Sequence, residues 1–213
     1  MKHLHPRCLL LSIGAVMVVS LLAACGGGND YTPKPQAYLR IDLPPHLYDT
    51  YDTTALPFTF DYSRSALVQW KEVRHVDTLG RPVPAPRGER WLTVIYPQYK
   101  GYLFLTYKPL HSLRNFQEQV DTAYKSMQTH FVYSSGIDEN RFVDAAHHLY
   151  GTTYRIKGQN VASTYQFWAS DSTHHFLRGA FYIDETPNSD SLAPILNYIQ
   201  DDIDHLIETL RWK

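Results

Sequence analysis

The tetrapeptide Leu22-Ala23-Ala24-Cys25 limits which part of the chain can fold. It ends an apolar stretch that follows Lys2 and Arg7, and small residues before a cysteine form a lipobox, where a secretory signal is removed and the cysteine receives acyl chains such as palmitate. The apolar stretch is shorter than the ~20 residues of a membrane-spanning helix, which argues against a transmembrane anchor. We therefore expect residues 1–24 to be a lipoprotein signal peptide and Cys25 to bind the membrane through its lipid.

The chain has two cysteines, Cys8 within this signal and Cys25 directly after it. Cys8 leaves with the signal and Cys25 is consumed by lipid, so the mature body has no disulfide although it is exported to an oxidising compartment. Its stability must come from a hydrophobic core, for which one domain of this length is ample. We expect residues 25–30 to be the lipidated cysteine and a short tether, and residues 31–213 to form a single domain.

The charge balance of the mature chain excludes one class of partner. Without Lys2 and Arg7, the 20 basic residues fall to 18, against 21 acidic ones, and no basic cluster is present, so we expect no nucleic-acid partner. The 16 tyrosines, 9 phenylalanines and 4 tryptophans are many for this length. Aromatic residues favour β-strands and, where exposed, binding surfaces.

Strand patterns dominate the middle of the chain. Trp91–Tyr96 and Tyr102–Tyr107 are apolar on both faces and flank a short turn, which predicts a central antiparallel pair. Residues 77–90 are rich in proline and glycine and predict a loop or hairpin tip. Further strands are expected at Phe58–Tyr62, Val68–Val73, His148–Lys157, Val161–Ala169 and His174–Asp184.

Two segments carry the spacing of an amphipathic helix. Ser112 can cap a helix whose apolar residues recur at three- and four-residue intervals up to Met127. A second helix begins near Ser191 and continues through an aliphatic stripe that includes Ile203 and ends at Leu210. We therefore predict an α+β fold, an antiparallel sheet of about six to seven strands packed with two amphipathic helices.

Candidate catalytic and metal-binding groups do not converge in the sequence. The doublets His147-His148 and His174-His175 lie on expected strands, where neighbouring side chains point to opposite faces, so a doublet cannot easily hold one ion. The acidic pairs Asp138-Glu139, Asp184-Glu185 and Asp201-Asp202 are typical of turns or solvated helix faces. We expect no enzyme activity, no cofactor and no metal.

The segment after the three glycines differs from a flexible tether. Tyr31, Pro33, Lys34 and Pro35 stiffen the chain, because proline favours an extended conformation, and the following residues alternate in polarity, with Arg40 and Asp42 on one side. We expect residues 31–44 to be ordered and to offer a partner-binding surface near the membrane. The alternative is a structured N-terminus without a partner.

Three separated segments resemble the gliding-motility lipoprotein D family (GldD) of Bacteroidota. They are "DYTPKPQAYLRIDLP", "DSTHHFLRGAFYIDETPNSDS" and "IDHLIETLRWK". The second segment contains His175 and Arg178, which we add to the partner-binding candidates. The resemblance implies a non-catalytic cell-envelope lipoprotein, an accessory or scaffold for gliding motility, type IX secretion or both. The stretch Gly80–Glu89 does not match the family pattern and is expected to be a local elaboration.

Two further readings remain open. The order of elements is similar to the PsbP/Mog1-like α/β/α sandwich, which allows a periplasmic small-ligand- or lipid-binding lipoprotein; a histidine-dependent metalloenzyme is the third reading. The residue after Cys25 is glycine rather than the aspartate that favours inner-membrane retention in some bacteria. No acidic run for surface export follows. We therefore expect the periplasmic face of the outer membrane, with gliding or secretion proteins of the envelope as partners.

Overall fold

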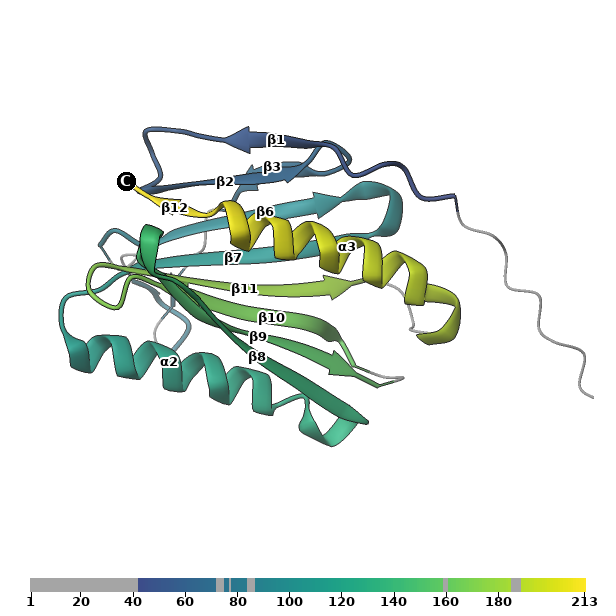
Figure 1. Ribbon diagram of the computed structural model, residues 1–213. Coiled ribbons are helices and arrows are strands. Elements are labelled where there is room, and N and C mark those ends of the chain that lie inside the picture. Colours follow the sequence, from purple (N-terminus) through teal and green to yellow (C-terminus); the bar gives the residue numbers. More distant parts are fainter. Residues whose placement is uncertain (1–41, 72–74, 77, 84–86, 159–160, 185–188) are drawn as a thin grey trace, which may run out of the picture. The chain divides into compact units, whose positions relative to one another are not determined.

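The computed structural model describes residues 42–213 apart from residues 72–74, 77, 84–86, 159–160 and 185–188 (Figure 1). The chain divides at residue 38 into two units, and all described residues belong to the second, Leu39–Lys213. No helix of the described part is long and apolar enough to cross a membrane. The expectations for Cys25 and residues 31–41 lie outside the described residues.

A seven-stranded antiparallel sheet forms the centre of the second unit. The predicted central pair is confirmed as two neighbouring strands joined by the 3-10 turn η1 (Pro97–Tyr99). Across the sheet the strands follow the order β3 (Leu67–Trp70), β6 (Arg90–Tyr96), β7 (Gly101–Pro109), β11 (His175–Ile183), β10 (Ser163–Ser170), β9 (Leu149–Lys157) and β8 (Gly136–Asp144).

The two helices cover opposite faces of this sheet. Adjacent residues of a strand point to opposite sides, and in β11 the side chain of Leu177 joins the main core, whereas that of Phe176 packs with Ala123 of α2 (Leu113–Gln128). The main core includes Ile203 of α3 (Ser189–Thr209). The predicted α+β fold, a sheet between two amphipathic helices, is thus confirmed.

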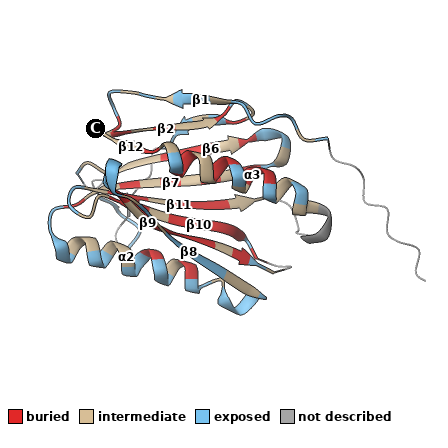
Figure 2. Cartoon of the chain, viewed as in Figure 1, coloured by how far each residue is buried: buried red, intermediate tan, exposed pale blue. Residues whose placement is uncertain are grey.

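A small second sheet closes the α3 side. It consists of β1 (Tyr48–Tyr51), β2 (Phe58–Ser63) and β12 (Arg211–Trp212), with β2 in the middle. Phe58 and Phe60 of β2 are fully buried in the main core beside α3. Figure 2 shows the buried residues on the inner strands and on the inward side of α3. Packing of α3 between two sheets explains why its stripe is so apolar.

Helix α2 begins where the sequence predicts. The Ser112 hydroxyl accepts a hydrogen bond from the backbone N–H of Asn115 at 3.1 Å, which satisfies one of the unpaired donors of the first turn. Ala123 and Met127 are buried against the sheet. The first half of the helix buries less: Phe116 and Val120 are only partly covered.

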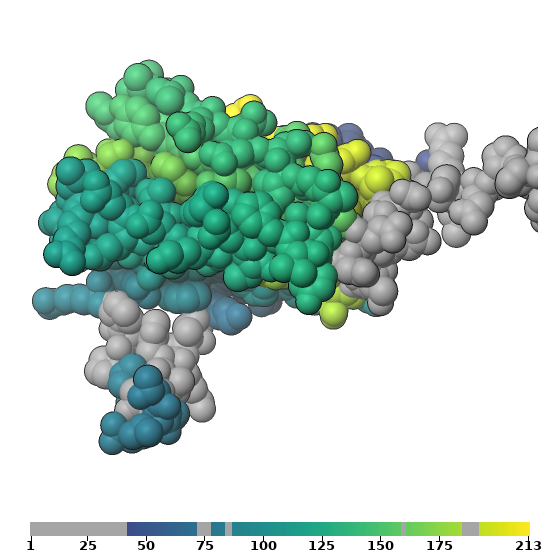
Figure 3. Space-filling model, turned by 90° about the horizontal axis from the view of Figure 1, so that it is seen from below, coloured from purple at the N-terminus to yellow at the C-terminus, as the bar shows by residue number. Residues whose placement is uncertain are grey.

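The proline-rich stretch contains a small hairpin. Its strands are β4 (His75–Val76) and β5 (Pro82–Val83), and Gly80 in the turn has a positive φ of 76°. The described hairpin residues stand clear of the body of the molecule (Figure 3). Two more 3-10 turns, η2 (Phe131–Tyr133) and η3 (Ala145–His147), flank β8.

Two interpretations of acidic pairs are wrong. Asp138-Glu139 lies in the middle of β8, a strand that the sequence pattern does not indicate, rather than in a turn. Asp202 is not a solvated helix residue, because its side chain is buried, while its neighbour Asp201 is exposed. The short strands β1 and β12 are also absent from the predicted elements.

Candidate functional site

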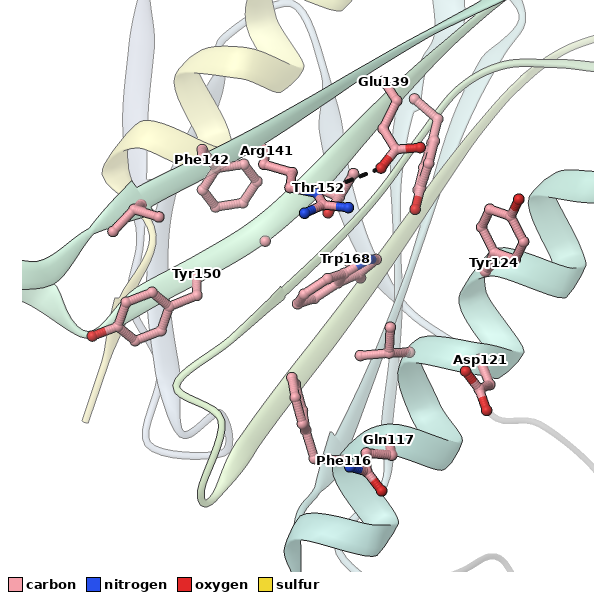
Figure 4. Close-up of a pocket in the computed structure, with 14 residues that line it drawn as sticks. Phe116, Gln117, Asp121, Tyr124, Glu139, Arg141, Phe142, Tyr150, Thr152 and Trp168 are labelled. Atoms are coloured by element: carbon pink, nitrogen blue, oxygen red, sulfur yellow. Dashed lines mark ion pairs between the residues drawn. The ribbon is translucent and has the colours of Figure 1, made fainter.

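A groove of about 700 Å³ separates α2 from the end of the sheet (Figure 4). We call it the α2 groove. Its lining residues come from the helix and from β8, β9 and β10: Phe116, Gln117, Val120, Asp121, Tyr124, Glu139, Arg141, Phe142, Val143, Tyr150, Gly151, Thr152, Tyr154 and Trp168.

Aromatic side chains form the floor of the α2 groove. The Trp168 ring of β10 stacks on Phe176 with ring centroids 5.9 Å apart and meets the edge of Phe116 at 6.0 Å. The Trp168 indole Nε1 is buried, and no hydrogen bond is found for it in the described structure. Such a floor binds apolar groups, because aromatic rings offer large contact areas with specific stacking geometry.

A glycine shapes the wall beside β8. A Cβ atom on Gly151 would lie 2.2 Å from the Trp168 carbonyl oxygen and 2.3 Å from Phe142 Cζ. Only a residue without a side chain therefore lets the Phe142 ring lie over β9. The rim of the groove is polar: Arg141 Nε lies 3.7 Å from a carboxylate oxygen of Glu139, and this exposed pair contributes little to stability.

A second groove of about 490 Å³ lies on the other face of the same strands. We call it the α3 groove. It is lined by Asn140, Phe142, Val143, Asp144, Leu149, Thr153, Arg155, Asp204, Ile207 and Glu208.

The charges of the α3 groove are largely paired. Asp204 forms an ion pair with Arg155 and accepts a hydrogen bond from the Tyr165 hydroxyl. Burial, followed by the bond to Asp204, raises the pKa of Tyr165 well above its ordinary value, so it stays a donor. The Asp144 carboxylate pairs with His147 at 2.6 Å. Glu208 has an exposed side chain, and none of the ion pairs found among the described residues includes it.

A buried polar cluster under α3 escaped the sequence analysis. The completely buried Asp202 carboxylate lies 2.7 Å from His46 Nδ1. His46 stacks on Tyr198 at 4.3 Å, and Tyr48 stacks on His205 at 3.7 Å. Burial and the nearby Asp202 raise the pKa of Tyr48 above its ordinary value. The cluster fastens the segment before β1 to α3 and has no open cavity among those found in the described part.

Most of the partner-binding residues expected near the N-terminus lie outside the described residues. Asp42 is described and exposed. The remaining expected residues lie outside the described part and stay a prediction: Tyr31, Pro33, Lys34, Pro35 and Arg40.

The two candidates on β11 point to opposite faces of the sheet and cannot form one surface. His175 lies on the α3 side, where its Nδ1 is 2.9 Å from the Tyr107 hydroxyl and its ring stacks on Trp212 at 5.0 Å. Arg178 lies on the α2 side, where it donates to the Gln166 side-chain oxygen at 3.0 Å. Burial lowers the pKa of both groups. No observation tests their contact with a partner.

The histidine doublets do not converge. His147 belongs to η3 and His148 has a positive φ of 50°, so this doublet sits in a turn rather than on a strand. His174 and His175 lie at the start of β11, which β10 separates from β9. Within the described residues, no group of three or more metal-ligating side chains could hold an ion.

Comparison with known protein families assigns the chain to one of them. The profile described as "Gliding motility lipoprotein GldD" matches residues 28–212. The chain belongs to the GldD family. The predicted resemblance is therefore confirmed over nearly the whole chain, and with it the class of gliding-motility-associated lipoprotein, which is not a known enzyme family.

Other comparisons add little beyond the GldD family. A search of curated proteins finds no match. Among solved structures, the chain is similar to the solution structure of cyanobacterial PsbP (CyanoP) from Synechocystis sp. PCC 6803. The identity is 11% and the TM-score 0.45, over 82% of this chain and 98% of that one.

Proposed function

We propose that this GldD-family protein is a non-catalytic accessory or scaffold lipoprotein of the cell envelope, needed for gliding motility, type IX protein secretion or both. The observation that carries the proposal is the family match over residues 28–212, which extends from just after the lipobox to the end of α3 and β12. The lipobox supports anchoring through Cys25, and the glycine after it supports the periplasmic face of the outer membrane.

A scaffold acts through surfaces, and the structure supplies candidates for them. The α2 groove has an aromatic floor and a charged rim, and the α3 groove combines apolar with polar and charged side chains, which suits recognition of another polypeptide. Tyr31, Pro33, Lys34 and Pro35 would add a contact surface close to the membrane.

A small-ligand- or lipid-binding role is the second candidate. The specific observation in its favour is the aromatic floor of the α2 groove, whose volume of about 700 Å³ falls in the range of small-molecule sites. Native mass spectrometry of the protein purified from its own envelope distinguishes the two: a scaffold shows the mass of the lipidated chain alone, whereas a ligand binder retains an additional small molecule.

The proposed function is tested by deleting the gene and restoring it in variant forms. Wild type should restore colony spreading and the release of type IX cargo. A variant with residues 31–35 replaced by Gly-Ser-Gly-Ser-Gly should be anchored and present at normal levels, yet restore neither. Normal spreading and normal cargo release in the deletion strain would overturn the proposal. Full function of the Gly-Ser variant would remove only the N-terminal surface from it.

A further inference from the structure

The strand β8 ends the seven-stranded sheet without a neighbour on its outer side. It has nine residues, against four in β3 at the opposite edge, and no strand of the described chain pairs with it there. Figure 1 shows it running along the open border of the sheet. An unpaired edge of this length presents a row of backbone donors and acceptors to which another strand can bind.

The hydrogen-bonding pattern of the sheet determines which residues of β8 offer these groups. The N–H of Asp171 donates to the carbonyl of His175, so odd-numbered residues of β10 bond to β11 and even-numbered ones to β9. Even-numbered residues of β9 therefore bond to β10, and its odd-numbered residues bond to β8. The odd-numbered residues of β9 lie opposite even-numbered residues of β8, so the even-numbered residues of β8 bond to β9. In agreement, the Thr153 hydroxyl donates to the Asn140 carbonyl. The backbone groups that point outward belong to Ile137, Glu139, Arg141 and Val143.

The two grooves lie on either side of this edge. Phe142 and Val143 of β8 line both the α2 groove and the α3 groove. Side chains of a strand added beside β8 would alternate between the two faces of the sheet, so successive side chains would enter successive grooves. If β8 were only an edge strand protected from aggregation, its charged residues Glu139 and Arg141 would suffice. A groove on each face of the sheet beside it is not needed for that protection.

The residues that line each groove indicate which type of side chain fits into it. Trp168 and Phe116 form an aromatic floor in the α2 groove, which suits an aromatic or branched aliphatic side chain. In the α3 groove, Asp204 pairs with Arg155 and Asp144 contacts the His147 ring, whereas the carboxylate of Glu208 has no such partner among the described residues. A lysine or arginine beside Glu208 complements this remaining charge.

We propose that β8 is a strand-addition site. It binds an extended segment of a partner protein in which apolar side chains for the α2 groove alternate with basic side chains for the α3 groove. This inference deepens the proposed function, and the identification of the partner as an envelope protein rests on it; the site itself is tested with purified components.

The binding test uses the mature chain, residues 25–213, with Cys25→Ala to remove the lipid. The probe is a labelled synthetic peptide as long as β8, in which lysine alternates with phenylalanine or valine. Two control peptides carry N-methyl groups, either on all apolar residues or on all lysines. Antiparallel addition turns the backbone of the apolar residues toward β8, and parallel addition turns that of the lysines.

We expect one of the two methylated peptides to bind at least about tenfold more weakly than the unmethylated one, because several backbone hydrogen bonds are lost. The amide protons of Glu139, Arg141 and Val143 should exchange more slowly when the unmethylated peptide is bound. Equal binding of all three peptides, or protection confined to α2, would show a side-chain groove rather than a strand-addition site and would overturn the proposal.

Variants of Arg141 isolate the backbone contribution. Arg141→Pro removes an outward N–H and leaves the hydrogen bonds to β9 intact, whereas Arg141→Ala loses the same side chain and keeps the N–H. The proline variant should therefore bind the peptide at least about tenfold more weakly than the alanine variant. Equal affinities of the two variants contradict the proposal. If Arg141→Pro does not fold, Glu208→Lys replaces it: it should weaken the lysine peptide and strengthen a peptide with glutamate in place of lysine.

A last comparison separates the partner from the chain itself. If the chain's own N-terminal residues occupy β8, a chain that lacks residues 26–38 will bind the peptide at least about tenfold more tightly, by removal of a tethered competitor, and the proposal is overturned. In cells, loss of cargo release with Arg141→Pro but not with Arg141→Ala, at normal protein levels, supports use of the site by the machinery. Normal release with Arg141→Pro overturns that use, while the deletion strain tests the proposed function independently.

Discussion

His46, just before β1, and Asp202, in the middle of α3, form a contact of 2.7 Å between an imidazole nitrogen and a completely buried carboxylate. The residues are far apart in the sequence, and their contact joins the beginning of the described chain to its last helix. A buried carboxylate without a partner is costly, so the contact with the partly exposed His46 stabilises the folded state. The segment before β1 is thereby fastened to α3.

Truncation of this partner should destabilise the protein. In His46→Ala the Asp202 carboxylate keeps its burial and loses its nearest donor. We expect the free energy of unfolding to fall by about 1–3 kcal/mol. This is less than the value for a fully buried pair, because His46 is partly exposed. Urea denaturation measures the loss. The exposed neighbour provides the control: Asp201→Asn should change the free energy by less than about 0.5 kcal/mol. Equal effects of the two variants would contradict a structural role of the contact.

A methyl group at Gly151 should damage the α2 groove. In Gly151→Ala the new Cβ collides with the backbone oxygen of Trp168 and with the Phe142 ring, and neither can move without disturbing β9 and β10. We expect a loss of about 1–3 kcal/mol. Gly136→Ala at the start of β8 meets no atom within 4 Å and is the matched control. Thermal melts that are the same for the two variants would show that the close packing over Gly151 is not required.

The half-buried His175 should make the protein less stable in acid. Burial lowers its pKa in the folded state, so the unfolded chain binds the proton more readily than the folded one. The stability is complete above about pH 6.5, the ordinary histidine value, and is lost as the pH falls through the lowered folded pKa. In His175→Gln, the free energy of unfolding should therefore fall less between about pH 7 and pH 5. A wild-type slope in His175→Gln would disprove the assignment.

Asp171 should contribute in a lower pH range. Burial alone would raise its pKa, but hydrogen bonds from the backbone N–H groups of His175, His174 and Thr173 outweigh burial and lower it. Its contribution is present above about pH 4 and is lost as the pH falls through the lowered value. Asp171→Asn should flatten the stability curve below about pH 4. Chemical denaturation at a series of acidic pH values measures this, and an unchanged acid limb contradicts it.

Membrane attachment should depend on a single side chain, the thiol of Cys25. Cys25→Ala should leave the protein soluble or as an unprocessed precursor and abolish metabolic labelling with palmitate, because several acyl chains are needed for firm binding. Cys8→Ala, which changes only the predicted signal, should be lipidated normally. Labelling that persists in Cys25→Ala would refute the lipobox assignment.

The inner strands and both helices could be predicted because their patterns depend on burial. Trp91–Tyr96 and Tyr102–Tyr107 are apolar on both faces, which few structures other than an inner strand accommodate. The stripe through Ile203 repeats at the period of a helix and is buried as expected. Family resemblance agreed with these patterns and was confirmed by the match over residues 28–212.

The edge strand β8 could not be predicted, for a physical reason. β8 carries four consecutive exposed residues, from Asp138 to Arg141, and an edge strand with polar side chains on both faces has no periodicity to detect. Its structure comes from hydrogen bonds to β9, which lies later in the sequence. The burial of Asp202 could not be predicted for a different reason. Its acidic neighbours suggest a solvated helix face, and its partner His46 lies far away in the chain.

The position of β12 has a consequence for the time course of folding. Arg211 and Trp212 pair with Thr59 and Phe58 of β2, and Lys213 donates its backbone N–H to Pro57. Contacts between segments so distant in the chain form late, since a long loop must close first. During export from the N-terminus onward, one edge of β2 therefore stays unpaired until β12, which follows α3 in the chain, has crossed as well. A chain that stalls or is clipped shortly before Arg211 would leave Phe58 without the Trp212 ring that packs against it, and envelope proteases would meet an exposed strand edge that the folded domain covers.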